Sequence, residues 1–276
     1  MAAKRTDAVL VVDQEGVLVG ILTDKDIAYR VVAEGLDARS TTISSVMTKN
    51  PIHLLATGHR NDALTIMLEK KFRHLPVLSK ANCEDGSGET CTVVGILDIT
   101  KCVFDRLDEL SLKAHKDDAL LQAFGTINEN YGAELLGNIS SQIQGCPDVG
   151  SVLAKISASP DYLVPEVTLR VNVKEAACLM KELHVTAVLV VGSSEGEDVA
   201  GKSLIMIIGI FTTKDIILRV LAAQLEPSNT SIVRVMTSHP DFVTPCTSIL
   251  ECLQKLKGIH QQTYFSWALF TFTSCQ

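Results

Sequence analysis

The sequence lacks the features that mark several large classes of protein. No apolar run among its 276 residues reaches the roughly 18 residues that a membrane-spanning helix requires, and no apolar signal core follows the first methionine. Basic residues do not predominate, because 25 Lys and Arg stand against 32 Asp and Glu and leave a net charge of −7. Proteins that bind nucleic acids usually carry a basic face. We therefore expect a cytoplasmic protein with no membrane span and no nucleic-acid partner.

Residue patterns typical of metal sites are missing as well. The eight cysteines form no Cys-x-x-Cys pair, and the seven histidines form no His-x-x-x-His pair. Reduced thiols are therefore the expected state of the cysteines. The other polar residues suggest no catalytic arrangement beyond chance spacing. We expect a protein that is not an enzyme and holds no metal ion.

One long segment of the chain occurs twice. Residues 20–37, GILTDKDIAYRVVAEGLD, return as residues 209–226, GIFTTKDIILRVLAAQLE, at an offset of 189. The run Val-Met-Thr at residues 46–48 returns at the same offset as residues 235–237. Internal repeats of this length define the architecture before any single motif does. The chain is therefore expected to consist of copies of one unit.

Upstream of this segment the offset changes. Residues 8–12, AVLVV, return as residues 187–191 at an offset of 179. The ten-residue difference lies in residues 192–202, which are rich in Gly, Ser and acidic residues, and we interpret them as an extended hairpin loop. At this offset Met1 corresponds to Met180, inside a segment with helical spacing. We therefore expect the sequence to begin partway through a helix.

The complete copies define a unit of a short strand, a helix, an apolar strand, a turn, a second strand and a second helix. Strands made almost entirely of Val, Ile and Leu and flanked by helices predict an α/β (α+β) fold with helices on one side of each sheet. Four β-α-β-β-α units fit the chain, the first and the fourth of them truncated. Their expected ranges are 1–37, 42–110, 160–226 and 233–276, with a helical linker at 111–159.

The fourth unit departs from the pattern. At the offset of 189, residues 72–76 should return at residues 261–265, but the two stretches do not match. The stretch Tyr264–Phe272 is apolar and aromatic, yet too short to span a bilayer. We interpret it either as a strand or as retained non-coding sequence. In either case an incomplete unit leaves apolar surface uncovered, which predicts association or poor solubility.

Taken together, these motifs resemble the CBS domain, which is named after cystathionine β-synthase. The patterns are V-M-T-x-x-P, D-A-L-x-x-M, F-R-H-L-P-V and G-I-L-T-x-K-D-I. The resemblance implies two CBS pairs, at residues 1–110 and 160–276. It also implies a non-catalytic regulatory module. Many members of the family bind adenosine nucleotides (AMP, ADP or ATP) between paired repeats. A narrower resemblance is to eukaryotic tandem CBS-pair proteins with a Phox/Bem1 domain, to which no segment here corresponds.

Thr23 and Asp26 stand three residues apart where a strand turns into a helix. On physical grounds they form a helix cap, with the hydroxyl capping the helix and the carboxylate in its first turn. The resemblance adds a nucleotide site, in which the Thr hydroxyl receives phosphate and the Asp carboxylate accepts hydrogen bonds from ribose. Thr212 and Asp215 repeat the arrangement. The cap and the nucleotide site are compatible with each other.

Two lysines and a divergent copy complete the motif. Lys25 and Lys214 lie in the same turns, either as solvated surface lysines or as contacts for phosphate. In the second unit, Asp98 replaces the Thr and Lys101 replaces the Asp. Asp98 can still cap a helix, but it would repel phosphate, and Lys101 cannot accept a hydrogen bond from ribose. We expect no nucleotide to bind through this copy.

The resemblance also assigns residues of the partner repeats to the clefts. Arg73 and His74 would contact phosphate or base in the first pair, with Ala8 beside the base. Phe72, Leu75 and Pro76 serve equally well as core and turn residues. In the second pair, Ala187 would line the corresponding cleft, together with Thr186 and Val188.

The resemblance therefore predicts a nucleotide sensor that passes its state to a protein partner or to a second copy in a homodimer. One alternative is a ligand-free scaffold, in which the Thr and Asp pairs are only helix caps. Another is a regulatory fragment of a larger enzyme or transporter. Nucleotide binding distinguishes the sensor from the scaffold.

Overall fold

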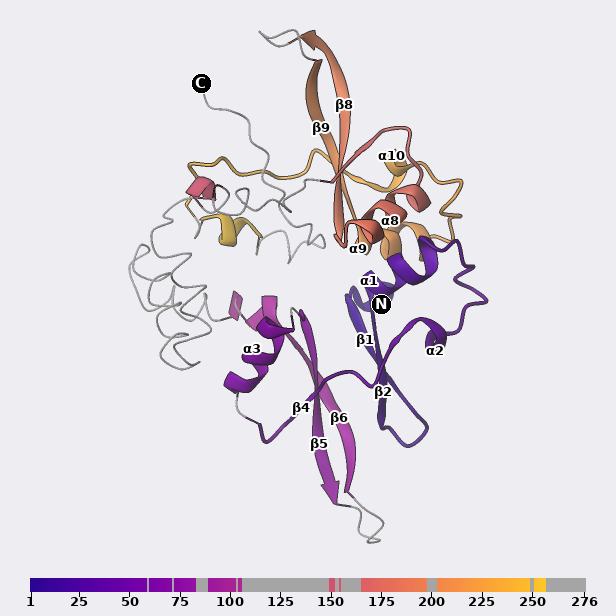
Figure 1. Ribbon diagram of the computed structural model, residues 1–276, viewed down its shortest axis with the longest axis vertical. Helices are drawn as coiled ribbons and strands as arrows, with labels where there is room; N and C mark the ends of the chain where they lie inside the picture. Colours follow the sequence, from indigo (N-terminus) through magenta and orange to yellow (C-terminus); the bar gives the residue numbers. More distant parts are fainter. Residues whose placement is uncertain are drawn as a thin grey trace.

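The computed structural model describes residues 1–58, 60–70, 72–82, 89–102, 104–105, 149–151, 154, 165–197, 203–248 and 251–256. Within these residues lie three small sheets, each accompanied by helices (Figure 1). This arrangement confirms the predicted α/β class. The predicted linker at 111–159 falls almost entirely outside the described residues, and the stretch Tyr264–Phe272 lies wholly outside them.

The first repeat forms a three-stranded sheet of order β1-β2-β3, all antiparallel. Its own elements are η1 (Ala2–Lys4), β1 (Ala8–Val12), β2 (Leu18–Thr23), α1 (Asp24–Ile27) and the π-helical η2 (Ala28–Val32). The helix α2 (Ile43–Val46) and the strand β3 (Thr48–Lys49), which completes this sheet, come from the start of the range predicted for the second repeat. Because α1 runs directly into η2, one continuous helix follows β2. Some of its apolar residues pack against the third repeat, and not only against the sheet of the first repeat.

The second and third repeats share one topology, in which a short parallel strand and a helix precede an antiparallel hairpin. The second contains β4 (Leu54–Leu55), α3 (Arg60–Glu69), β5 (His74–Asn82) and β6 (Glu89–Asp98). The third contains β7 (Glu166–Thr168), α8 (Val173–Glu182), β8 (Ala187–Glu197), β9 (Ser203–Thr212), α9 (Thr213–Asp215) and the π-helical η3 (Ile216–Leu221). After them come α10 (Ile232–Val235) and β10 (Thr237–Ser238), which extends the third sheet.

The sheet register reproduces the repeat seen in the sequence. In the first repeat, Gly20 pairs with Lys49, and at the offset of 189, Gly209 pairs with Ser238. The same offset relates Arg30 to Arg219, whose guanidinium groups donate to the carbonyls of Val46 and Val235 at 2.8 and 2.9 Å. The two halves of the chain are thus built on the same local contacts as well as on similar sequences.

The segment 192–202 differs from its predicted form. The strand β8 continues to Glu197, which pairs with Ser203 at the start of β9. Much of the inserted sequence therefore lengthens the two strands of the hairpin, which projects from the rest of the molecule (Figure 1). Strand pairing propagates outward from the Val- and Ile-rich part of the hairpin, where β-branched residues favour the extended backbone. Only residues 198–202 lie outside the described part of this segment.

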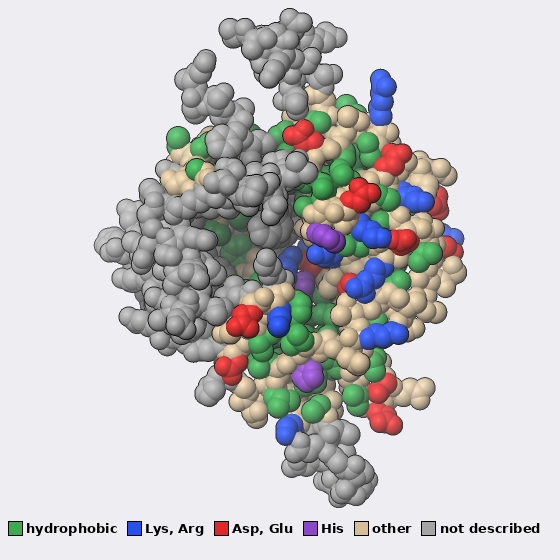
Figure 2. Space-filling view, viewed as in Figure 1, with side chains coloured by type: hydrophobic (Ala, Val, Ile, Leu, Met, Phe, Trp, Pro, Cys, Tyr) green, Lys and Arg blue, Asp and Glu red, His purple; other side chains and the backbone are tan. Residues whose placement is uncertain are grey.

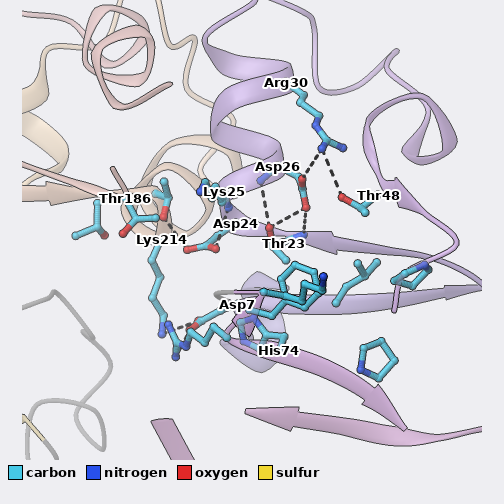
Figure 3. Close-up of a pocket in the computed structure, with 18 of the residues that line it drawn as sticks. Asp7, Thr23, Asp24, Lys25, Asp26, Arg30, Thr48, His74, Thr186 and Lys214 are labelled. Atoms are coloured by element: carbon cyan, nitrogen blue, oxygen red, sulfur yellow. Dashed lines mark hydrogen bonds and ion pairs between the residues drawn. The ribbon is translucent and has the colours of Figure 1, made fainter. Parts of the chain in front are cut away.

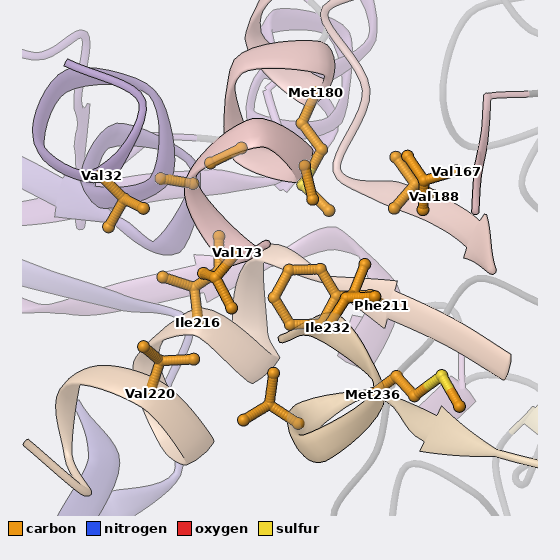
Figure 4. Close-up of a cluster of buried hydrophobic side chains, with 14 of the residues drawn as sticks. Val32, Val167, Val173, Met180, Val188, Phe211, Ile216, Val220, Ile232 and Met236 are labelled. Atoms are coloured by element: carbon orange, nitrogen blue, oxygen red, sulfur yellow. The ribbon is translucent and has the colours of Figure 1, made fainter. Parts of the chain in front are cut away.

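One buried core joins the two halves of the chain. From the first repeat it takes Ala28, Tyr29 and Val32, and from the third it takes the buried faces of α8, β8, β9 and η3 (Figure 4). Phe211, Val173 and Ile216 are fully buried at its centre. The Tyr29 hydroxyl donates to the carbonyl of Val185 at 2.7 Å. Because apolar burial drives the association of these elements, the first and third repeats form one packed unit.

Smaller clusters complete the interior. Leu22, Val31 and Val46 form the core of the first repeat, while Ala63, Met67 and Leu75 fix α3 against the second sheet. Of the described helices, none combines the length and the apolarity that crossing a membrane would take.

The glycines at equivalent positions of β2 and β9 give a test of this packing. A β-carbon at either glycine would crowd a methionine side chain, Met236 at Gly209 and Met47 at Gly20. At Gly209 it would also lie 2.9 Å from the Thr237 carbonyl oxygen, whereas the three nearest atoms at Gly20 all belong to the Met47 side chain. A backbone atom cannot move aside as a methionine side chain can. We expect Gly209→Ala to lower the free energy of unfolding by about 1–3 kcal/mol, and Gly20→Ala to lower it by less. Urea denaturation of both variants measures the difference, and equal losses would contradict this account.

Candidate functional site

A pocket of about 700 Å³ opens where the first three repeats meet (Figure 3). The first repeat contributes the end of β2 and the start of α1. The second contributes the residues that lead into β5, and the third contributes the segments before β8 and at the start of α9. Its lining residues are Asp7, Ile21, Thr23, Asp24, Lys25, Asp26, Arg30, Thr48, Pro51, Ile52, Lys70, Phe72, Arg73, His74, Pro76, Thr186, Ala187, Thr212, Thr213 and Lys214.

Thr23 and Asp26 form a reciprocal helix cap in the wall of the pocket. The Asp26 amide donates to the Thr23 hydroxyl at 3.2 Å, and the Asp26 carboxylate accepts from the Thr23 amide at 2.9 Å. The other carboxylate oxygen lies 3.3 Å from Arg30. The capping interpretation of the sequence is therefore correct. Since both side chains also line the pocket, the cap leaves them next to any bound ligand.

Thr212 and Asp215 form the same cap in the third repeat, with the corresponding bonds at 3.3 and 2.9 Å. The surroundings differ, because the Asp215 side chain is only 3% exposed, against 13% for Asp26. Thr212 reaches the pocket, but Asp215 is not among its lining residues. Burial raises the pKa of the Asp215 carboxyl, while Arg219 at 3.4 Å acts in the opposite direction.

Asp7 connects cations of two other repeats. One carboxylate oxygen lies 2.9 Å from Arg73 of the second repeat, and the other lies 2.8 Å from Lys214 of the third (Figure 3). The Asp7 side chain is 8% exposed and that of Lys214 is 14% exposed. Lys214 is therefore a partly buried partner in an ion pair rather than a solvated surface lysine. Three repeats meet at this one carboxylate.

Arg73 also contacts Asp98, which stands at the Thr position of the second repeat. The guanidinium lies 3.2 Å from the Asp98 carboxylate, which accepts from the Thr100 amide at 2.9 Å. Burial opposes ionisation of Asp98, but the charge and hydrogen bond of Arg73 outweigh it and lower the pKa of this carboxyl. Burial lowers the pKa of the neighbouring His74 imidazole, and the charge of Arg73 adds to this effect. His74 is therefore harder to protonate than an exposed histidine.

Asp24 and Thr213 occupy equivalent positions in their repeats and contact each other. The Thr213 hydroxyl donates to the Asp24 carboxylate at 2.7 Å. Burial raises the pKa of the Asp24 carboxyl, and the nearby charge of Asp7 raises it further. This hydrogen bond joins the first and third repeats at the edge of the pocket.

The lining carries more positive than negative charge, with five Lys and Arg side chains against three Asp. Lys25 lies 5.3 Å from the centre of the Tyr29 ring. Ile21, Ile52, Phe72 and Pro76 provide an apolar surface in the same pocket. The pocket thus offers hydroxyl, carboxylate, cationic and apolar contacts together, as a polar ligand with a flat apolar part requires.

The structure brings eight of the ten residues named from the sequence into this one pocket. They are Thr23, Asp26, Thr212, Lys25, Lys214, Arg73, His74 and Ala187. Ala8 lies on β1 and Asp215 lies in the interior, and neither lines the pocket. Thr186 and Ala187, expected in a cleft of the second pair, line the same pocket as Thr23.

Other residues that line the pocket were not predicted from the sequence. Asp7, Asp24 and Thr213 act across repeats, so no local motif marks them. The offset of 189, which aligns Asp24 with Thr213, was the one signal that could have suggested their contact. Lys70 and Arg30 also reach the pocket from outside the recognised motifs, while Thr48 belongs to the V-M-T-x-x-P motif but was not named as a site residue.

Two short catalytic patterns occur by chance in the β8–β9 hairpin, at residues 192–196 (Gly-Ser-Ser-Glu-Gly) and 196–203 (Gly-Glu-Asp-Val-Ala-Gly-Lys-Ser). They fit the spacing of a serine nucleophile elbow and of a phosphate-binding loop. Both motifs need a strand followed by a helix. Here Ser194 lies within strand β8, and Ser203 begins the antiparallel strand β9. The structural context of either motif is therefore missing.

Comparison with known proteins adds family evidence to this geometry. The family model described as CBS domain matches residues 1–33 and 43–104. The Meiotically up-regulated gene 70 protein of Schizosaccharomyces pombe is 32% identical over 274 residues, which cover 93% of this chain and 36% of that protein. The CBS domain-containing protein CBSCBSPB2 of Arabidopsis thaliana is 34% identical over 266 residues, covering 92% of this chain and 42% of that protein. The chain thus spans about two fifths of these relatives.

A solved structure shows the same fold over most of the chain. Protein MJ1225 from Methanocaldococcus jannaschii superimposes with a TM-score of 0.54 and covers 92% of this chain and 78% of its own. The sequence identity is 13%, so this likeness concerns the fold alone.

The opposite pKa shifts of Asp24 and Asp98 predict opposite effects of substitution. Because folding raises the pKa of Asp24, the ionisation of this carboxyl lowers stability progressively as the pH rises from 3.8 to the raised pKa. Because folding lowers the pKa of Asp98, its ionised form stabilises the fold at neutral pH, and this stabilisation is lost as the pH falls from 3.8 to the lowered pKa. At pH 7 we therefore expect Asp24→Asn to raise the Tm and Asp98→Asn to lower it. Thermal unfolding followed by circular dichroism measures both changes.

Each difference from the wild type should disappear as the wild-type carboxyl becomes protonated. The difference in Tm between Asp24→Asn and the wild type should shrink as the pH falls below the raised pKa of Asp24, and it should vanish only below 3.8, the ordinary pKa that the carboxyl has in the unfolded chain. The difference for Asp98→Asn should persist to lower pH and vanish only below the lowered pKa of Asp98. Two shifts of the same sign at pH 7 would show that the two carboxylates do not occupy these different electrostatic environments.

Proposed function

This chain is a CBS domain protein, and we propose that it is a non-catalytic regulatory module that binds an adenosine nucleotide in the pocket between its repeats. The observation that carries the proposal is the convergence of Thr23 and Asp26 with Arg73 and His74 in one cavity of about 700 Å³. These are the residues that the family resemblance assigns to nucleotide binding. A volume of this size lies within the range of small-molecule sites.

The chemistry of the lining matches the parts of a nucleotide. Asp26 would accept hydrogen bonds from the ribose hydroxyls, because its carboxylate faces the pocket while it caps α1. Phe72, which is 38% exposed, and Ile52, which is 44% exposed, offer apolar surface against which a base can stack. Arg73 and Lys214 supply the positive charge that phosphate groups require.

The position of the pocket supports a regulatory role. Its walls come from the first, second and third repeats, so a ligand would contact both halves of the chain. A ligand shifts only an equilibrium between states that it binds unequally. A nucleotide held jointly by Thr23 and Lys214 would favour the arrangement in which the two halves are closed around it. A partner protein that contacts both halves would sense this change.

A ligand-free scaffold is the second candidate, and one observation favours it. Both Thr–Asp pairs already form complete capping boxes, which satisfy the Thr hydroxyls and one oxygen of each Asp within the protein. In that function the repeats would only assemble partners or a homodimer. Binding measurements distinguish the two functions, because a scaffold needs no nucleotide.

We expect AMP, ADP or ATP to raise the Tm of the wild-type chain and to lose this effect in Asp26→Ala. A ligand at about 100 times its Kd adds about 2.7 kcal/mol to the free energy of unfolding. Asp215→Ala is the matched control, since it removes the same cap from a carboxylate that does not line the pocket. A thermal-shift titration of the three proteins measures the ligand-dependent change in Tm.

The ligand-dependent change, rather than the Tm itself, is the measurement that matters, because each substitution also removes a helix cap. A change retained in Asp215→Ala and lost in Asp26→Ala supports the proposal. A folded wild-type chain whose Tm none of the three nucleotides changes would favour the scaffold.

A further inference from the structure

Asp7 places a negative charge where the pocket collects its cations. Its two carboxylate oxygens lie 2.9 Å from Arg73 and 2.8 Å from Lys214, and all three side chains line the pocket. The Asp7 side chain is 8% exposed, so little solvent screens its charge. The carboxylate therefore occupies the two cations that a ligand phosphate would otherwise meet.

The repeat shows that the backbone contact at this position does not depend on a carboxylate. At the offset of 179, Asp7 corresponds to Thr186. The Asp7 carbonyl accepts from the Asp24 amide at 2.9 Å, and the Thr186 carbonyl accepts from the Thr213 amide at 2.9 Å. The backbone contact is the same in both repeats, while the side chain is an acid in one and neutral in the other. The charge of Asp7 is thus a feature of this pocket that the shared backbone contact does not require.

We propose that Asp7 is a specificity-determining residue that makes the pocket select nucleotides by the charge of their phosphate chain. The proposal rests on the nucleotide-binding function argued above. The Asp7 carboxylate repels a bound phosphate and competes with it for Arg73 and Lys214. Coulomb repulsion grows with the charge of the ligand, and that charge rises from AMP through ADP to ATP. Asp7 therefore weakens the binding of ATP more than that of ADP, and the binding of ADP more than that of AMP.

The test is isothermal titration calorimetry of the wild-type chain, Asp7→Asn and Asp7→Thr. The ligands are adenosine, AMP, ADP, ATP and inorganic tripolyphosphate. Threonine is the residue that the third repeat carries at this position, so Asp7→Thr keeps a side chain that the fold already accommodates. Glu15→Gln is the control, because it removes the same charge from an exposed residue outside the pocket.

We expect the Asp7 variants to bind ATP at least about tenfold more tightly than the wild type, which corresponds to about 1.4 kcal/mol. The gain should be smaller for ADP and smallest for AMP, and adenosine should bind unchanged. Glu15→Gln should match the wild type with every ligand. A ratio of ATP to AMP affinity that stays the same in folded Asp7 variants would overturn the proposal and leave nucleotide binding intact.

Tripolyphosphate separates this proposal from the function on which it rests. Where the wild-type chain binds no nucleoside compound, the nucleotide function fails, yet the charge of Asp7 still acts on an inorganic polyanion. A gain in tripolyphosphate affinity in both Asp7 variants then supports the role of Asp7, and no gain in either variant refutes it.

Discussion

The packing of the first repeat's helix into the core of the third repeat is the constraint on which the site depends. Ala28, Tyr29 and Val32 are buried together with residues of α8, β9 and η3. This shared core fixes the start of α1 beside the start of α9, so that Lys214 reaches Asp7 and Thr213 reaches Asp24. Each repeat on its own would present only part of the pocket. The polar chemistry of the site is therefore held in place by apolar burial some distance from it.

The sequence predicted the local architecture well because that architecture is repeated. The offset of 189 aligned Gly20 with Gly209 and Arg30 with Arg219, and the strand pairing and hydrogen bonds follow the same offset. The hairpin at 192–202 was predicted less well. Its Gly, Ser and acidic residues are typical of a loop, but the strands that flank it extend their pairing to Glu197 and Ser203. Composition could not show how far the ladder would continue.

Some residues of the candidate site could likewise be predicted from the sequence, and others could not. Residues inside the recognised motifs, such as Thr23 and Arg73, were named from the sequence and line the pocket. The role of Asp7 depends on a lysine more than two hundred positions away, and a local motif carries no information about such a contact. Asp215 shows that a matching motif does not ensure a place in the site. It matches Asp26 in sequence and in hydrogen bonding but is buried away from the pocket. A motif identifies the cap, while the packing around it decides whether a ligand can reach the carboxylate.

The hydrogen bond between Thr213 and Asp24 has a consequence for how such a molecule can evolve. The two residues are equivalent in the repeat and contact each other, as equivalent residues do at the twofold axis of a symmetric dimer. In a symmetric dimer of identical halves, each residue on the axis faces its own copy. Two carboxylates would then repel each other there, and no acid–hydroxyl pair could form between unlike residues. Joining the halves in one polypeptide frees the two positions to mutate separately, and tandem duplication thereby makes available an asymmetric site that an exact dimer cannot build.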